Sequence, residues 1–150
     1  MAEEAEKSVK LSGDQVARLA AQERRKLDGL GRRIETFQGF RNELSMALDS
    51  VKAISKTEKG EKILVNLGAG IFAEAALQEN SRGIATIAGN VFNYRGFNDL
   101  EKTLEAKMKN VDKAVSGVIT EQQKALSRLN QLEQLLEAGR RYMQQRQPKQ

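Results

Sequence analysis

The glycines in the segment KILVNLGAGIFAEAAL, residues 62–77, are the first feature to test for chemistry, because glycine-rich loops can hold phosphate groups. A phosphate-binding loop opens a helix, whose N-terminus supplies free N–H groups and a positive dipole. After the GAG triplet at positions 68–70, however, residues 71–77 are followed at once by the polar stretch QENSRG. That is too short for such a helix, and the triplet lacks the lysine and hydroxyl of a Walker loop. We therefore predict a turn between two strands.

Composition removes most other catalytic chemistry. The 150 residues include no histidine and no cysteine. This excludes thiolate or imidazole zinc sites, Cys-His and Ser-His-Asp nucleophiles and histidine general bases. Carboxylates are present, but nothing in their spacing places a pair in a pocket. We expect a protein that is not an enzyme and has no metal site and no cofactor.

The proportions of residue types favour long helices over a thick globular core. Apolar residues make up 39% of the chain, aromatic residues 5% and charged residues 30%. This balance suits helices that bury one narrow stripe, and the single proline, Pro148, stands almost at the end. No apolar run approaches the roughly 18 residues of a membrane span, and the acidic start MAEEAEKSVK is unlike a secretory signal. We expect a cytoplasmic protein without a membrane segment.

Residues 12–56 carry the heptad pattern of a coiled-coil helix. Ser12 and Gln15 have the spacing of a capping box. Two apolar seams follow, interrupted by Glu23 and Arg41. They comprise Ala20, Leu27, Ile34 and Leu48, and Val16, Leu30, Phe37, Leu44 and Val51. A helix of roughly 65 Å, at 1.5 Å per residue, needs a partner helix to bury such a stripe.

Residues 98–146 supply that partner. We predict Asn98 as its N-cap, with Glu101 at the third position. Its two seams comprise Met108, Val115, Gln122, Leu129, Leu136 and Met143, and Leu104, Val111, Val118, Ala125 and Leu132. Because the two helices have nearly equal lengths on either side of a central insert, we predict that they lie antiparallel, with both termini at the free end.

The central insert, residues 62–95, has a strand-like pattern instead. Four short apolar runs are separated by turn residues, and Gly89-Asn90 suits a tight hairpin turn. The predicted fold class is therefore α+β, a long antiparallel coiled-coil helical hairpin with two β-hairpins inserted at its base. The predicted division is a polar tail at 1–11, a domain at 12–147 and a tail at 148–150.

This plan resembles that of the alpha-class subunits of prefoldin. The likeness rests on TEKGEKILVNLGAGIFAEAAL and RGIATIAGNVFNYRGFNDLEKTLEAKM, and it extends over about residues 12–146. Beta-class subunits have one hairpin, so two hairpins select the alpha class. The chain departs from the family pattern at Asn66, where proline is common, and at Arg95, where glutamate often follows the aromatic pair.

The resemblance implies a subunit of an ATP-independent chaperone. Such a holdase captures unfolded polypeptide at coiled-coil tips and delivers it to a group II chaperonin. The implied partners are beta-class prefoldin subunits, in a hexamer of two alpha-class and four beta-class chains, together with unfolded proteins and the group II chaperonin.

The hairpins are the candidate assembly surface, because the open edges of short sheets pair with other chains. The strand residues assigned to assembly are Ile63, Val65, Leu67, Ile71, Phe72, Ile84, Ile87, Val91 and Phe92. The alternative is that these residues form the core of a monomer. Four short strands without a covering helix bury too little apolar surface for such a core.

The free end of the helices is the candidate client-binding tip, because exposed apolar groups there can hold unfolded chains weakly. The residues assigned to it are Val16, Leu19, Leu135, Leu136, Tyr142 and Met143. Some of these side chains can instead complete the coiled coil, which is the interpretation we favour for Leu136. Arg140, Arg141 and Arg146 are candidates for chaperonin contact, and equally for complementing the helix dipole.

A different class of function is also open, a basic coiled-coil scaffold for the ribosome or nucleic acid. The net charge is +5, and basic residues cluster at positions 24–26 and 32–33 and again beyond Gly139. The sequence lacks the interleaved aromatic residues of stacking platforms and any helix-turn-helix pattern. Glutamates nearby can balance these clusters on a solvated helix face, so we rank nucleic-acid binding below the chaperone interpretation.

Overall fold

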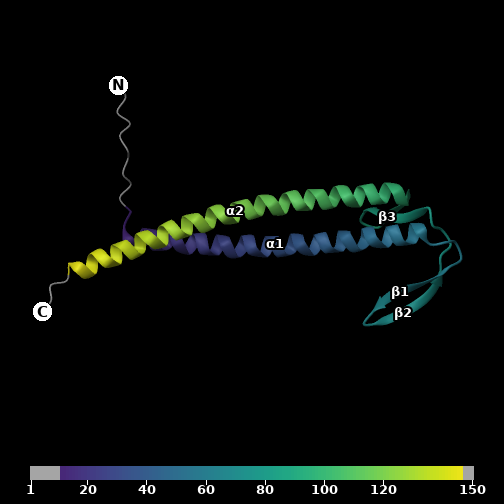
Figure 1. Ribbon diagram of the computed structural model, residues 1–150, viewed down its shortest axis with the longest axis horizontal. Coiled ribbons are helices and arrows are strands. Elements are labelled where there is room, and N and C mark those ends of the chain that lie inside the picture. Colours follow the sequence, from purple (N-terminus) through teal and green to yellow (C-terminus); the bar gives the residue numbers. More distant parts are fainter. Residues whose placement is uncertain (1–10, 147–150) are drawn as a thin grey trace, which may run out of the picture. The chain divides into compact units, whose positions relative to one another are not determined.

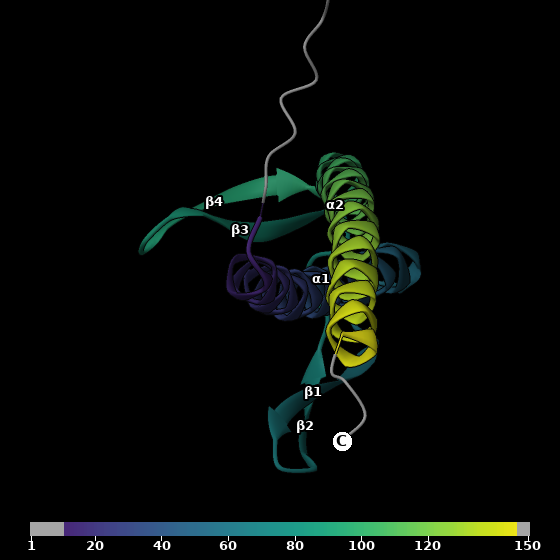
Figure 2. The ribbon, with the colours of Figure 1, turned by 90° about the vertical axis from the view of Figure 1, so that its left-hand side faces the viewer.

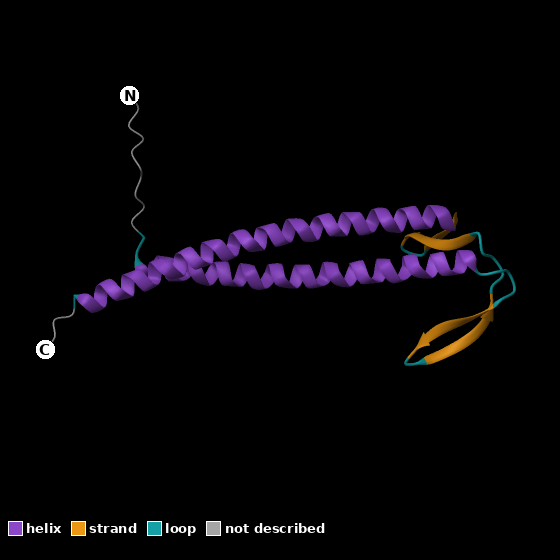
Figure 3. Cartoon of the chain, in the orientation of Figure 1, coloured by secondary structure: helices purple, strands orange, loops and turns teal. Residues whose placement is uncertain are grey.

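The computed structural model describes residues 11–146 and contains two helices and four strands (Figures 1 and 3). In chain order they are α1 (Gly13–Lys56), β1 (Lys62–Gly68), β2 (Ile71–Ala76), β3 (Arg82–Ala88), β4 (Val91–Gly96) and α2 (Phe97–Gln145). The predicted α+β class is confirmed. The predicted tails lie outside the described residues, apart from Leu11.

The chain forms two compact units, and both helices contribute to each. We call the part formed by residues 11–36 and 115–146 the helical unit, and residues 37–114 the hairpin unit.

The helical unit is an antiparallel pair of helices with a narrow core. Arg24 of α1 pairs with Glu133 of α2 at 2.6 Å, whereas Lys26, further along α1, pairs with the earlier Glu121 at 2.9 Å. Its buried apolar residues are Val16, Ala20, Leu30, Val118, Ala125 and Leu129. All six belong to the predicted seams, so the heptad pattern selects the side chains that face the other helix.

The capping box at the start of α1 is present as predicted. The backbone N–H of Ser12 donates to Oε1 of Gln15 at 2.8 Å, and the backbone N–H of Gln15 donates to Oγ of Ser12 at 3.3 Å. The two bonds satisfy N–H groups that have no partner within the helix.

The predicted N-cap of α2 is wrong. The helix begins at Phe97, so Asn98 lies inside its first turn. The strand β4 runs to Gly96 and passes into α2 without a loop. The backbone N–H of Phe97 donates to the carbonyl oxygen of Ser81 at 3.0 Å, and the phenyl ring is buried. Tertiary contacts therefore fix the start of this helix in place of a capping side chain.

The hairpin unit contains two separate antiparallel sheets of two strands each, drawn as separate ribbons in Figure 2. In the first, Ile63 lies opposite Ala75 and Val65 opposite Ala73. In the second, Ile84 lies opposite Tyr94. Each register shifts by one residue beside its turn.

The GAG triplet is a hairpin turn and not a phosphate loop. Gly68, Ala69 and Gly70 have φ angles of 98°, 49° and 77°, a left-handed run that favours glycine. The Asn66 side chain supports it, since its Oδ1 accepts a hydrogen bond from the backbone N–H of Gly68 at 2.8 Å. Gly89, with φ of 53°, opens the second turn.

The root of the first hairpin is bonded to the segment that follows α1, and the root of the second packs on α2. The backbone N–H of Gly60 donates to the carbonyl oxygen of Leu77 at 2.7 Å, and Nδ2 of Asn80 donates to the carbonyl oxygen of Thr57 at 3.1 Å. On the other side, Gly83 of β3 lies against the side chains of Phe97 and Leu100. The root of each hairpin is therefore held by hydrogen bonds or packing. Among the described residues, the hairpin turns form no hydrogen bonds to any segment outside their own hairpin.

Candidate functional site

Both hairpins expose large apolar side chains, and near the root of the second hairpin these alternate with small, partly covered residues. In the second hairpin Gly83 and Ala85 are half-buried. Ile84 and Tyr94, which lie opposite each other, are both more than 60% exposed. A stable monomer does not normally direct its large apolar side chains to water over a whole sheet face. This arrangement indicates a surface that another chain covers.

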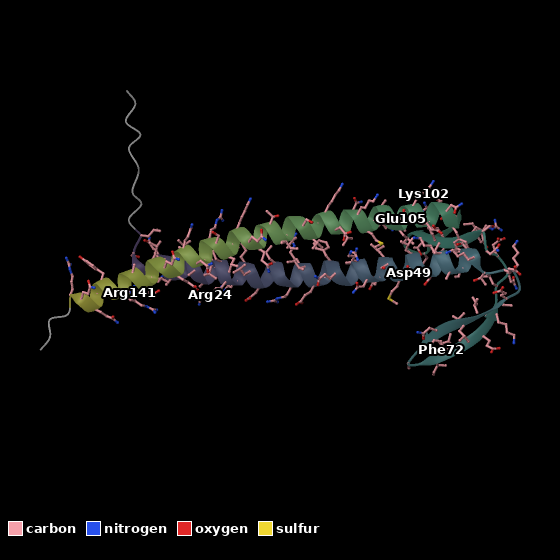
Figure 4. All side chains as sticks on the ribbon, viewed as in Figure 1. Arg24, Asp49, Phe72, Lys102, Glu105 and Arg141 are labelled. Carbon is pink, nitrogen blue, oxygen red and sulfur yellow. The ribbon has the colours of Figure 1, made fainter. Side chains whose placement is uncertain are left out.

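Eight of the nine strand residues assigned to assembly from the sequence are exposed, by between 41% and 64%. They are Val65, Leu67, Ile71, Phe72, Ile84, Ile87, Val91 and Phe92. Ile63 is half-buried and lies on the same face of the first hairpin as Ala73 and Ala75. Phe72, labelled in Figure 4, lies on the first hairpin.

Sequence reasoning missed two exposed residues of these faces, Leu64 and Tyr94. Leu64 is 69% exposed and alternates with Lys62 and Asn66, so its face looked polar. Tyr94 is 64% exposed, and the guanidinium carbon of Arg82 lies 4.6 Å from the centre of its ring. The cross-strand register, which pairs Ile84 with Tyr94, was the signal that could have found it.

The sheets also have open edges. Within residues 11–146 each sheet contains two strands, so every strand has one side whose backbone groups meet no other strand. Such rows of free N–H and C=O groups are templates for strand addition. Isolated two-stranded hairpins are marginally stable in water, which is a second reason to expect a partner chain.

A groove of about 950 Å³ lies between the start of α1 and the end of α2, within the helical unit. We call it the helix-end groove. Five of the six residues assigned to the client-binding tip line it, namely Val16, Leu135, Leu136, Tyr142 and Met143. Leu19, which is 39% exposed, is not part of its lining.

The lining residues divide by exposure into a floor and a rim. Val16 is buried and Leu136 half-buried, so both complete the seam between the helices. Leu135, Tyr142 and Met143 are more than 50% exposed and offer apolar surface to another molecule. Gly139 also lines the groove, opposite Val16 as the antiparallel pairing requires.

The three arginines assigned to chaperonin contact have different surroundings. Arg140 lines the groove. Arg141, labelled in Figure 4, forms an ion pair with Glu137 one turn earlier on α2. The guanidinium carbon of Arg146 lies 4.7 Å from the centre of the Tyr142 ring. The last turn of α2 contains no basic residue, so dipole compensation, which fades within one turn, does not account for Arg140 or Arg141.

The basic residues at positions 24–26 belong largely to interhelical ion pairs. Arg24 pairs with Glu133, and Lys26 with Glu121, whose pKa is lowered mainly by the hydrogen bond from Lys26. Glu23, which interrupts the predicted seam, faces Arg128 at 3.9 Å, and its Oε2 is buried with no hydrogen-bond partner among the described residues. These pairings weaken the case for a nucleic-acid surface on this part of the helices.

Residues 11–146 contain neither a membrane-spanning helix nor a cluster of metal ligands. Neither helix is long and apolar enough to span a membrane. The carboxylates nowhere gather in groups of three or more that could hold a metal ion within this range.

Comparison with known proteins decides the family. The family model described as prefoldin subunit matches residues 24–140, which is more than half of the chain. The chain belongs to the prefoldin family. The prefoldin subunit alpha of Nitrosopumilus maritimus is 28% identical over 102 residues, covering 68% of this chain and 70% of the relative. That of Thermofilum pendens is 23% identical over 104 residues, covering 69% of this chain and 81% of the relative.

A solved structure shows the same fold. The filamentous prefoldin of Methanocaldococcus jannaschii, determined by cryo-EM, superposes with a TM-score of 0.67 at 14% identity, covering 77% of this chain and 95% of that one. With two hairpins and relatives named as alpha subunits, this is an alpha-class prefoldin chain and a chaperone subunit. The family consists of chaperones and not of enzymes.

Proposed function

We propose that this chain is a subunit of an ATP-independent holdase. It holds unfolded polypeptide in the helix-end groove and passes it to a group II chaperonin. It acts in the cytoplasm, in a hexamer with beta-class prefoldin subunits. The observation that carries the proposal is the pairing of two exposed apolar surfaces on one family member, one on the hairpins and one at the helix ends.

Assembly through the hairpins is supported by burial and backbone bonding together. The exposed faces offer large side chains such as Phe72 and Phe92, and the free edges offer unpaired backbone groups. Strand addition from neighbouring subunits covers the exposed side chains and pairs the free backbone groups. Closing the strands into a barrel removes the open edges. Two hairpins per chain allow each subunit to contact two neighbours.

Client capture in the groove is supported by its chemistry. Leu135, Tyr142 and Met143 provide exposed apolar contacts, and the methionine side chain adapts to varied shapes. A single groove of this kind binds weakly, so several grooves in one assembly add avidity. Weak, reversible binding without nucleotide is the physical basis of holdase action. Arg140 and Arg146 beside the groove are the basic groups proposed to meet the chaperonin.

The test is suppression of aggregation of a denatured model protein by the assembled complex without ATP. The variant Leu135→Ser/Tyr142→Ser removes two rim side chains of the groove, and Ile119→Ser/Leu126→Ser removes two exposed apolar side chains of α2 outside its lining. We expect the groove variant to lose suppression several-fold and the control to keep it. Absence of suppression by the wild-type chain, with or without a beta-class partner, would refute the proposal.

A further inference from the structure

The helix-end groove has an unbalanced charge at its rim. Within residues 11–146 the side chain of Arg140 forms no ion pair or hydrogen bond, although it lines the groove. Of the other basic side chains of the helical unit, Arg24, Arg128 and Arg141 face carboxylates, whereas Arg25, which is exposed and lies away from the groove, forms no ion pair within these residues. Among residues 11–146, Arg140 is therefore a cation without an ion-pair partner next to an apolar surface.

A second guanidinium contacts a side chain that lines the groove. Arg146 lies over the ring of Tyr142, which itself lines the groove, and this cation–π contact holds the charge in place without neutralising it. Among the described residues, the one carboxylate in the lining is Asp14, in the first turn of α1. There it complements the positive end of the α1 dipole. The described side chains on the α2 side of the groove therefore carry a net positive charge.

We propose that the groove prefers apolar polypeptide segments flanked by acidic residues over the same segments flanked by basic residues. This preference rests on the proposed function and adds a substrate class to it. The apolar lining contacts the apolar centre of the segment. Arg140 and Arg146 then meet carboxylates on its flanks, since guanidinium groups bind carboxylates through two parallel hydrogen bonds. Lysines on the flanks are instead repelled by the two arginines, which slows association of the segment with the groove.

The experiment compares two fluorescent peptides that share one apolar centre and carry either two glutamates or two lysines on each side. Binding to the full chain, alone and assembled with a beta-class subunit, is followed by fluorescence anisotropy. We expect the glutamate peptide to bind about three- to tenfold more tightly at low salt, because exposed ion pairs are individually weak. The difference shrinks as salt rises.

Two charge-reversal variants locate the effect. Arg140→Glu changes the rim of the groove, whereas Arg25→Glu makes the same charge change at an exposed position of α1 outside the lining. We expect Arg140→Glu to abolish or reverse the preference and Arg25→Glu to leave it intact. A preference that survives Arg140→Glu, or that Arg25→Glu removes equally, overturns the proposal.

The outcomes separate this proposal from the function it rests on. If neither peptide binds the wild-type chain, capture in the groove fails and the preference fails with it. If both peptides bind equally, capture stands and the preference is wrong. A third variant lacks residues 1–10, MAEEAEKSVK, which carry three glutamates. A tenfold gain in glutamate-peptide affinity on this deletion identifies the chain's own acidic segment as the occupant, which overturns the proposal for client segments.

Discussion

At the scale of single residues, Glu79 is the most strongly perturbed titratable group of the hairpin unit. Its Oε1 accepts hydrogen bonds from the hydroxyl and the backbone N–H of Ser81, at 2.6 Å and 3.0 Å, and Lys59 lies 3.8 Å away. The Ser81 side-chain bond is the largest cause, and together these groups lower the pKa of Glu79 from 4.5 to about 2. The charged carboxylate therefore holds the connection between the two hairpins.

The sign of the pH dependence follows from that lowered pKa. The stabilisation is complete above pH 4.5, where the carboxylate is ionised in both folded and unfolded chains, and is lost as pH falls through about 2. We expect Glu79→Gln to be less stable than wild type at pH 7, with the difference vanishing near pH 2. Urea unfolding at both pH values measures it, and an NMR titration midpoint of Glu79 near 4.5 would contradict the assignment.

At the scale of elements, the packing of β3 on the start of α2 depends on Gly83. A Cβ at this position would lie 3.0 Å from Cε1 of Phe97 and 3.2 Å from Cδ1 of Leu100, and the Phe97 ring is buried. We expect Gly83→Ala to destabilise the chain by about 1 kcal/mol, because the strand must move away from the helix.

The matched control for that substitution is Gly117→Ala in α2, where an added Cβ meets nothing within 4 Å. Alanine is a better helix former than glycine, so this change stabilises by up to about 1 kcal/mol. Urea unfolding of both variants compares them, and the expected result is opposite signs. Equal signs would show that space beside β3 does not decide the outcome.

The sequence predicted elements where the signal is local and failed where it is tertiary. Heptad spacing identified the buried seam residues such as Ala20 and Ala125, and the Ser12 capping box needs no more than one turn of chain. The start of α2 at Phe97 depends on a bond to Ser81, sixteen positions earlier, which no local pattern contains.

The candidate site shows the same division. Most exposed strand residues follow from the short apolar runs of the sequence, but Tyr94 requires the cross-strand register, which a one-residue shift beside the turn alters. The groove was predicted in outline, because helix ends leave apolar residues uncovered. The basic residues there were also predicted, but which of them form ion pairs was not, since ion pairing between side chains is decided by their three-dimensional placement.

At the scale of the whole molecule, the two units differ in the surfaces that they leave exposed. The hairpin unit has exposed faces and open edges that only another chain can cover, whereas the helical unit buries its seam by itself and keeps an open groove at its end. Under the proposed function, the hairpin surface serves assembly and the groove serves the capture of other polypeptides. A chain with a single exposed surface would have to use it for both purposes.

The decisive prediction at this scale concerns Leu64 and Tyr94, the two exposed strand residues that alternation did not identify. Lysine at both positions places charge on the hairpin faces, and burying an unpaired charge at an interface is costly. We expect Leu64→Lys/Tyr94→Lys to lose co-assembly with a beta-class subunit in native mass spectrometry. Ile119→Lys/Leu126→Lys, on exposed positions of α2, keeps it. Equal helix content by circular dichroism confirms that both variants fold. If the hairpin variant assembles like wild type, the strand faces are not the interface, and the open edges alone must hold the complex.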